Sequence, residues 1–418
     1  MRPLILVSLV CLLSTSVTAA ENWPQWRGPT SNGVAQGDGY ALKWDQKKNV
    51  QWKIPFTAQG SSTPIVWGDN IFITTPEKGS NYLYCLGFDG KQKWMADLGK
   101  ERQGKHRKAS GSNPSPATDG KHVFVYFKSG QLACVNYRGK VVWSKNLQDK
   151  YGQDTLWWDL GTSPVLTKDL IVVACMHSGP SYVAGFHKAT GKVAWRVERN
   201  LDAPRESAQS YTTPVVGQIN GKEVIYIVGA DHVTSHDAVS GKEIWRVKGL
   251  NPKQNGFFRS ISSPVLAKDL LIAPYARGAS LTAVRIGGKG DVTTSHVSWT
   301  KRLGADVPSP TFYKGSIYVC SDRGRITQLS TKGKIVQQLR LPGSRRAYSS
   351  SPIIAAGHLF ATREDGTTFV VKLAKKLEVV GENKLEEMTV ATPIFVRKKI
   401  LLRTARHLYC IGGAVSAE

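Results

Sequence analysis

Cysteine is scarce in this chain of 418 residues, and its six cysteines stand apart from one another. No Cys-x-x-Cys pair occurs, which excludes a thioredoxin-like redox centre and a c-type haem attachment site. No two cysteines are adjacent. Beyond residue 20 their number is odd and their spacing wide, which argues against a disulfide framework. These five are Cys85, Cys134, Cys175, Cys320 and Cys410.

Long apolar runs are missing from the sequence after its first 20 residues. Those residues combine Arg2, an apolar run from Leu4 to Leu13, and small residues up to Ala20. This pattern predicts a secretory signal peptide cleaved near Ala20, and therefore an exported, periplasmic or extracellular protein. The apolar run is too short to span a bilayer, so no transmembrane segment is expected. The bulky Val10 before Cys11 argues against lipid attachment there.

Acidic residues are also few, because 31 Asp and Glu face 56 Lys and Arg, giving a formal net charge of +25. Removing residues 1–20 takes away one arginine, which leaves 55 − 31 = +24. Such a charge favours anionic polymers, acidic protein surfaces or anionic lipid head groups. Since export separates the protein from nucleic acid, we expect no nucleic-acid partner.

Motifs that carry catalysis are absent as well. No Gly-x-Ser-x-Gly nucleophile elbow is present. His232 and His236 lie on an expected strand, where four residues span about 13 Å, too far for one zinc ion. No clustered Asp, Asn and Glu set indicates a calcium site. We therefore predict no metal site and no catalytic residue.

What the sequence does contain is a repeat. A Ser, Thr or other small residue precedes Pro and an apolar run eight times, at intervals of 41 (Pro352 to Pro393) to 52 residues (Pro64 to Pro116). One unit, residues 212–248, divides into four short strands joined by turns. Eight such units predict an all-β, eight-bladed propeller of four-stranded antiparallel blades.

A second motif, Gly-Lys-x-x-Trp, closes four of the eight units. We predict that its tryptophan lies on the outermost strand of a blade and packs against the next blade. The tryptophans assigned to this position are Trp52, Trp94, Trp143, Trp195, Trp245 and Trp299. Gln337 and Gly381 replace it in the sixth and seventh units, where the packing must differ.

The two ends of the chain are expected to meet. Residues 390–413 supply only about three strands, and residues 49–56 carry Trp52 where the missing outer strand would need it. We therefore expect the N-terminal strand to close the eighth blade. The predicted organisation is a signal peptide (1–20), an N-terminal extension (21–48), a propeller (49–413) and a tail (414–418), in a monomer.

The segments "SHDAVSGKEIW" and "GFHKATGKVAW", and the opening "WPQWRGPTSNG" from Trp23 to Gly33, carry a resemblance. The first two segments resemble the repeats of the pyrroloquinoline-quinone (PQQ)-like propeller family, and the opening resembles the start of many exported bacterial proteins with such repeats. The resemblance implies one of two branches. One contains quinoprotein dehydrogenases, which need PQQ and Ca²⁺; the other contains the non-enzymatic barrel-assembly propeller of the outer membrane.

The loops that join an outer strand to the next inner strand should all emerge on one face. They are rich in basic and aromatic residues, which suit recognition of a protein or sugar. The candidate binding residues are Arg102, Lys105, His106, Arg107, Trp157, Trp158, Arg205, Phe257, Phe258, Arg259, Arg345, Arg346 and Tyr348. Alternatively, Trp157 and Trp158 only plug the channel mouth and the charges are solvated.

The sequence thus favours a non-catalytic scaffold, without cofactor, that binds an envelope protein or another ligand through this face. A PQQ- and Ca²⁺-dependent alcohol or sugar dehydrogenase is the first alternative. Binding of an anionic polysaccharide, suggested by the net charge, is the second.

Overall fold

The computed structural model describes residues 21–343 and 347–412. The predicted signal peptide, the candidates Arg345 and Arg346, and the tail from 414 onward lie outside the described residues. No helix in the part of the chain that is described is long and apolar enough to cross a membrane.

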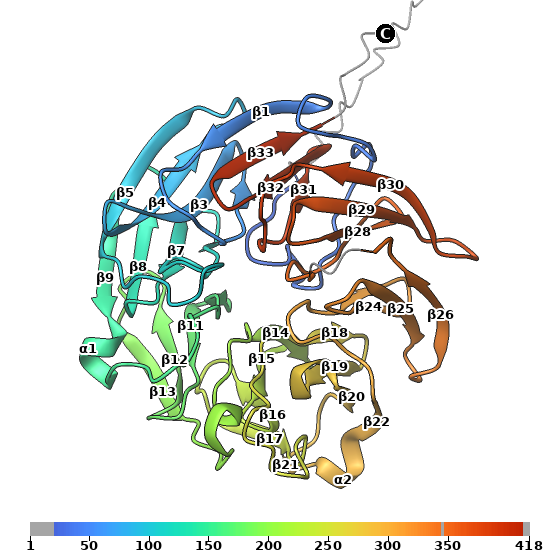
Figure 1. Ribbon diagram of the computed structural model, residues 1–418. Helices are drawn as coiled ribbons and strands as arrows, with labels where there is room; N and C mark the ends of the chain where they lie inside the picture. Colours follow the sequence, from blue (N-terminus) through green and yellow to red (C-terminus); the bar gives the residue numbers. More distant parts are fainter. Residues whose placement is uncertain (1–20, 344–346, 413–418) are drawn as a thin grey trace, which may run out of the picture.

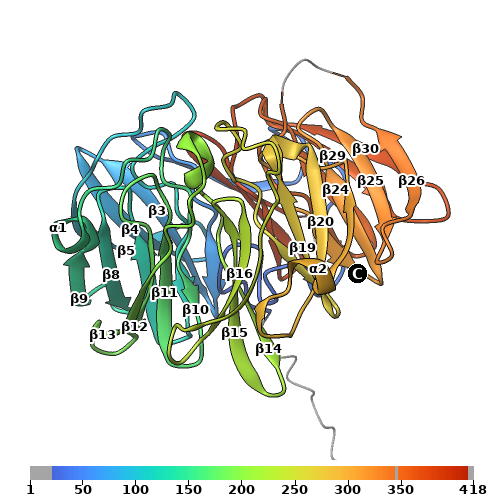
Figure 2. The same cartoon turned by 90° about the horizontal axis from the view of Figure 1, so that it is seen from below.

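Eight antiparallel sheets are arranged in a ring around a central axis, which confirms the predicted eight-bladed propeller (Figure 1). The strands run between the two faces of the ring (Figure 2).

Blade 1 consists of β2 (Ile65–Trp67), β3 (Asn70–Glu77), β4 (Ser80–Leu86) and β5 (Gln92–Lys100). Blade 2 consists of β6 (Ala117–Thr118), β7 (His122–Tyr126), β8 (Gln131–Asn136) and β9 (Val141–Asn146). Blade 3 consists of β10 (Val165–Leu166), β11 (Leu170–Cys175), β12 (Tyr182–His187) and β13 (Val193–Glu198). Blade 4 consists of β14 (Val215–Ile219), β15 (Lys222–Gly229), β16 (His232–Asp237) and β17 (Glu243–Val247).

The second half of the ring repeats the same order. Blade 5 consists of β18 (Val265–Ala267), β19 (Leu270–Tyr275), β20 (Ser280–Arg285) and β22 (Val297–Lys301). Blade 6 consists of β23 (Thr311–Tyr313), β24 (Ser316–Cys320), β25 (Arg325–Ser330) and β26 (Ile335–Arg340). Blade 7 consists of β27 (Ile353–Ala355), β28 (His358–Thr362), β29 (Thr367–Lys372) and β30 (Glu378–Lys384). Blade 8 consists of β31 (Ile394–Val396), β32 (Lys399–Arg403), β33 (His407–Ile411) and β1 (Val50–Pro55). The helical turns are α1 (Leu147–Tyr151), η1 (Arg205–Ala208), η2 (Ala276–Gly278) and α2 (Thr293–His296).

Strand β1 closes the ring by pairing antiparallel with β33, as the sequence predicted. Trp52 in β1 is opposite Cys410 in β33, the same pairing that Trp94 makes with Cys85 in blade 1. The N-terminal strand therefore occupies the position that the outermost strand holds in the other blades. This pairing covers the outer edge of β33, which would otherwise be left unpaired.

The motif tryptophans join neighbouring blades. In five of the six, the indole N–H donates a hydrogen bond to a backbone carbonyl of the following blade, at 2.7–3.2 Å. The same indole lies against the glycine of that blade's Gly-Lys turn. A Cβ atom at the glycine would come within 2.4–3.0 Å of the ring. These tryptophan–glycine pairs are Trp52–Gly90, Trp94–Gly139, Trp143–Gly191, Trp195–Gly241 and Trp299–Gly333. The Gly-Lys-x-x-Trp motif thus builds the contact between blades, as predicted.

The residue opposite each motif tryptophan is small. Cys85, Cys134 and Cys410 pair with tryptophans across the ladder and are fully buried. Burial raises the pKa of each of these three thiols to about 12. They are small apolar core residues, as the repeat position indicated.

Three joints between blades depart from the pattern. Trp245 is fully buried, but its indole N–H finds no acceptor among the described residues. There the connection between β20 and β22 contributes β21 (Gly290–Asp291), which pairs parallel with β17. Between blades 6 and 7, the Gln337 amide replaces the indole, donating to the carbonyl of Ala374 at 3.2 Å and accepting from the N–H of Leu377 at 2.9 Å.

At blade 7 the missing tryptophan comes from the N-terminal extension. Trp44 is 3% exposed, and its ring stacks on Phe360 at 6.4 Å. Its backbone N–H donates to Asn383 Oδ1 at 2.7 Å. A Cβ at Gly381 would lie 2.6 Å from the carbonyl oxygen of Leu42, so the glycine lets the extension approach the strand.

Candidate functional site

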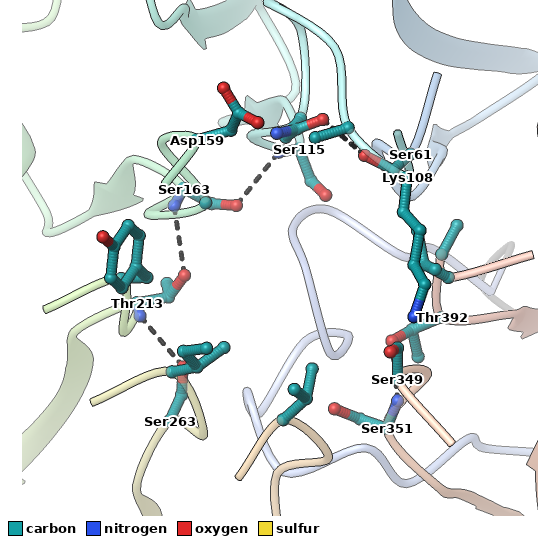
Figure 3. A pocket seen from close by; sticks show the side chains of 18 of the residues that line it. Ser61, Lys108, Ser115, Asp159, Ser163, Thr213, Ser263, Ser349, Ser351 and Thr392 are labelled. Atoms are coloured by element: carbon teal, nitrogen blue, oxygen red, sulfur yellow. Dashed lines mark hydrogen bonds between the residues drawn. The ribbon is translucent and has the colours of Figure 1, made fainter. Parts of the chain in front are cut away.

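A cavity of about 460 Å³ opens on the ring axis, at the face where the outer-to-inner loops emerge. We call this cavity the funnel. All eight of these loops contribute to its wall, so every blade has a residue within reach of a ligand at the centre (Figure 3). Its volume lies within the range of small-molecule sites in proteins.

The base of the funnel is a closed ring of hydrogen bonds between blades. The residue that precedes each motif proline donates its backbone N–H to the hydroxyl of the equivalent residue in the next blade. The eight donor–acceptor distances are 2.9–3.2 Å. We call this the hydroxyl ring; its members are Thr63, Ser115, Ser163, Thr213, Ser263, Ser309, Ser351 and Thr392. The Ser/Thr-Pro repeat therefore marks both the start of each inner strand and one link of this ring.

The opposite end of the channel is closed by residues 23–35, which we call the plug. Trp23 exchanges two backbone hydrogen bonds with Val66 of blade 1, and Ala35 N–H donates to Ile354 of blade 7. Between these anchors Trp26 forms part of the funnel floor. Figure 3 shows this blue N-terminal loop crossing the opening. Beside Trp26, the plug and the inner strands enclose a second, small cavity of about 10 Å³, which has room for one water molecule. The funnel is open at one end only.

The carboxylates around the funnel are each engaged by a cation. Asp159 forms an ion pair with Lys128, and both side chains are almost fully buried. Glu364 pairs with Lys108 at 2.7 Å. Figure 3 shows Lys108 and Asp159 on the two sides of the opening.

Arg259 organises the wall on the side of blades 3 to 5. Its guanidinium contacts Glu206 at 3.5 Å and Asp306 at 3.0 Å, and lies over the ring of Trp158 at 5.8 Å from the centroid. The Trp158 indole N–H donates to Glu206 at 2.8 Å. His106 meets the other edge of Trp158, with ring centroids 5.8 Å apart. Trp158 is thus a fixed part of the wall and leaves the mouth open, so it does not plug the channel.

Exposed aromatic side chains stand on the rim outside this wall. Trp157 is 45% exposed and Phe257 47% exposed. The exposed Arg205 stacks on Phe257 at 5.0 Å from the ring centroid. Large aromatic surfaces of this kind, beside arginine, are enriched at the centres of protein interfaces.

Of the predicted binding residues, His106, Trp158 and Arg259 line the funnel. Arg102, Lys105 and Arg107 lie in the loop before blade 2, outside the cavity lining. Arg102 there pairs with Asp154 at 2.8 Å, and Lys105 donates to the carbonyl of Leu156.

Two predicted aromatic residues are held in the interior. Tyr348 is 3% exposed and belongs to the core of blades 6 and 7, so its prediction as a surface residue of this face is wrong. Its ring covers Gly324, where a Cβ would lie 2.6 Å away, and this packing buries it. Phe258 is half-buried against the core of blades 4 and 5.

Several funnel residues were missed from the sequence. Lys108, Asp159, Tyr211 and Trp26 line the cavity. The hydroxyl ring was also missed, although its signal was available. The residue before each motif proline is Ser or Thr in all eight repeats, a chemical constraint that the start of a strand does not require.

The residues present do not fit the Ca²⁺ that quinoprotein dehydrogenases need beside PQQ. Ca²⁺ needs several carboxylate and amide oxygens converging on one point. Here the carboxylates of Asp159, Glu364, Glu206 and Asp306 each face lysine or arginine. Nowhere within residues 21–343 and 347–412 do three His, Cys, Asp or Glu side chains converge as metal ligands would.

Comparison with protein families decides the relationship. The model of the PQQ-repeat family described as outer membrane protein assembly factor BamB matches residues 33–180 and 157–379. The chain belongs to this family. No curated protein sequence matches it.

Among solved structures, the fold is similar to three propellers at 12% sequence identity each. BamB from Moraxella catarrhalis has a TM-score of 0.61, covering 86% of this chain and 98% of that one. A europium-containing methanol dehydrogenase has a TM-score of 0.71, covering 94% and 98%. The quinohemoprotein alcohol dehydrogenase from Comamonas testosteroni has a TM-score of 0.67, covering 94% and 81%. At this identity the likeness shows the fold alone, and it includes both an assembly factor and enzymes.

Proposed function

We propose that this protein is a non-catalytic, exported propeller that binds an envelope protein through its funnel face. The observation that carries the proposal is the contrast between the funnel wall and its rim. The charged groups of the wall are paired with one another, whereas Trp157 and Phe257 on the rim are about half exposed. Exposed aromatic side chains on a rigid ring favour a binding function.

Family membership also supports a binding function. The description of the matching family is that of an assembly factor, and a scaffold of this kind works through contacts with other proteins. The paired carboxylates disfavour the dehydrogenase alternative, because a Ca²⁺ ion would have to compete with lysine and arginine for every one of them.

The proposal is tested by retention of envelope proteins on immobilised mature protein. We expect the double variant W157A/F257A to lose a protein that the wild type retains. The matched control is V239A/I335A, which removes two exposed apolar side chains from other surfaces, 81% and 48% exposed. Equal retention by wild type and W157A/F257A would contradict the proposal.

Ionic strength separates the polysaccharide alternative from the protein one. Binding held by the basic surface charges weakens steeply between low and high salt, because exposed charges are screened beyond about 10 Å at 0.1 M. Retention through the aromatic rim persists at high salt. Collapse of all binding in high salt, with W157A/F257A unaffected, would favour an anionic polymer.

A further inference from the structure

The hydroxyl ring has eight donors that the protein does not use. Each ring hydroxyl accepts one backbone N–H, and among the described residues none of the eight donates to a protein acceptor. All eight residues are buried, with exposures of 7% or less. All of them except Ser309 line the funnel. A buried O–H without an acceptor is costly, so the protons of these seven hydroxyls require a ligand or water in the funnel.

A buried cation without a carboxylate partner lies beside the ring. Arg27 of the plug is 1% exposed and donates to the carbonyl of Ser309 at 3.3 Å and to the hydroxyl of Thr311 at 3.0 Å. The guanidinium also donates to the carbonyls of Asn32 and Pro310; among the described residues it has no carboxylate partner, and its Nε has no partner at all. Burial lowers its pKa to about 9, which leaves the side chain mostly protonated at neutral pH.

Arg27 lies next to three members of the hydroxyl ring. Ser309, whose carbonyl accepts from the guanidinium, is itself a ring member. The small cavity that Arg27 lines is bounded by two more ring members, Thr213 and Ser263. The ring therefore separates the open funnel above from the buried guanidinium below. Donors on the ring and a positive charge behind it both favour an acceptor group that carries negative charge.

We propose that the base of the funnel binds a single carboxylate group, held by hydroxyls of the ring and stabilised by the charge of Arg27. The carboxylate has acceptor atoms only, which matches a set of unused donors. One negative charge balances the charge of Arg27, whereas a doubly charged phosphate would leave a buried excess of charge. The proposal rests on the proposed function in one respect: we assign the carboxylate to the bound protein, as an acidic side chain or chain end.

The lysine and arginine side chains that line the described part of the funnel are all paired with carboxylates, and Arg277 lies 3.8 Å from Asp306. Lys108 and Arg259 are already engaged by Glu364 and by Glu206 and Asp306. The affinity for the carboxylate should therefore depend on the hydroxyls of the ring, and substitutions in the ring test the proposal most directly. Ring variants must preserve the fold, and the chain itself shows that Ser and Thr are interchangeable there.

The test uses trifluoroacetate as a probe, followed by ¹⁹F NMR line broadening with the mature protein. We expect broadening that acetate reverses.

The double variant S163A/S263A removes two ring donors and should weaken binding of the probe at least tenfold, while S163T/S263T retains the hydroxyls and should bind within twofold of wild type. S235A is the matched control, because Ser235 is fully buried on β16, away from the funnel lining, and its hydroxyl has no partner among the described residues. Absence of broadening, or equal broadening with S163A/S263A and wild type, would overturn the proposal.

Arg27→Met provides a second readout that leaves all eight ring hydroxyls in place. It should reduce probe binding while the thermal unfolding transition remains cooperative. Unchanged binding by R27M would refute the contribution of the buried charge.

Competition identifies the source of the carboxylate. A short peptide with a free C-terminal carboxylate that displaces the probe, while its amidated form does not, supports a protein ligand. Displacement by acetate but not by the peptide keeps the carboxylate site and assigns it to a free organic acid. Because W157A/F257A does not touch the ring, probe binding by that variant shows whether the site survives a failure of the rim proposal.

Discussion

At the scale of single residues, the recurring tryptophan acts together with a glycine of the neighbouring blade. Trp195 donates to the carbonyl of Ala238 at 3.2 Å and covers Gly241, whose φ of +73° only glycine adopts readily. The indole and the turn therefore form one joint, and neither residue serves the binding face.

Replacement of Trp195 by alanine should destabilise the protein by about 3–5 kcal/mol, because it removes a large buried ring and leaves a cavity between blades. Denaturant unfolding measures this change. Trp157→Ala is the matched control: Trp157 is 45% exposed, and its loss should change stability by less than about 0.5 kcal/mol. Similar losses in the two variants would show that the joint does not hold the blades.

Burial of His236 makes stability depend on pH. Desolvation lowers its pKa from 6.5 to about 4, and its ring nitrogens contact Gly241 and Thr234. The unfolded chain binds this proton below about pH 6.5, while the folded protein does not until about pH 4. Stability from this group is therefore intact above pH 6.5 and falls as the pH drops from 6.5 to 4.

His236→Gln should flatten the decline in unfolding free energy between pH 6.5 and 4, by up to about 3 kcal/mol. Urea titrations at several pH values measure the slope. The exposed His187→Gln is the control and should leave it unchanged. A slope that is the same in H236Q and wild type would refute the role of burial.

At the scale of elements, the N-terminal extension completes the propeller in three places. The plug closes the channel, Trp44 fills the joint at blade 7, and β1 completes blade 8. Several of these contacts join residues more than 280 positions apart, such as Arg27 and Ser309.

Trp44→Ala should destabilise the protein by about 3 kcal/mol, close to the effect of Trp195→Ala, since Trp44 is 3% exposed and stacks on Phe360. Chemical denaturation measures both. A loss below about 1 kcal/mol would show that the extension merely lies on blade 7 and does not support it.

The sequence predicted the elements that repeat and missed those that occur once. Eight Ser/Thr-Pro motifs and the Gly-Lys-x-x-Trp motif predicted the blades, their number and the closing strand, because a periodic pattern is visible without knowing the fold. The plug, Trp44 and the Gln337 contact each occur once, and they join residues that are far apart in the sequence. No repeating pattern in the sequence therefore indicates them. Tyr348 was misplaced because its loop position indicated exposure, while packing on Gly324 buries it.

At the scale of the whole molecule, the ring is a rigid frame with one open funnel. The hydroxyl ring joins all eight blades at the base of that funnel, so a ligand held there would contact the whole frame. The wall above it combines Trp158 and Arg259 with paired carboxylates, so its opposite charges largely offset one another.

The most direct test of a non-catalytic binding function is a titration of mature protein with PQQ in the presence and absence of Ca²⁺, followed by absorbance and melting temperature. A group that binds the folded state raises the melting temperature in proportion to its affinity. We expect no Ca²⁺-dependent binding and no Ca²⁺-dependent rise in melting temperature at high micromolar PQQ. Saturable, Ca²⁺-dependent binding that stabilises the protein would contradict this account and indicate a quinoprotein dehydrogenase.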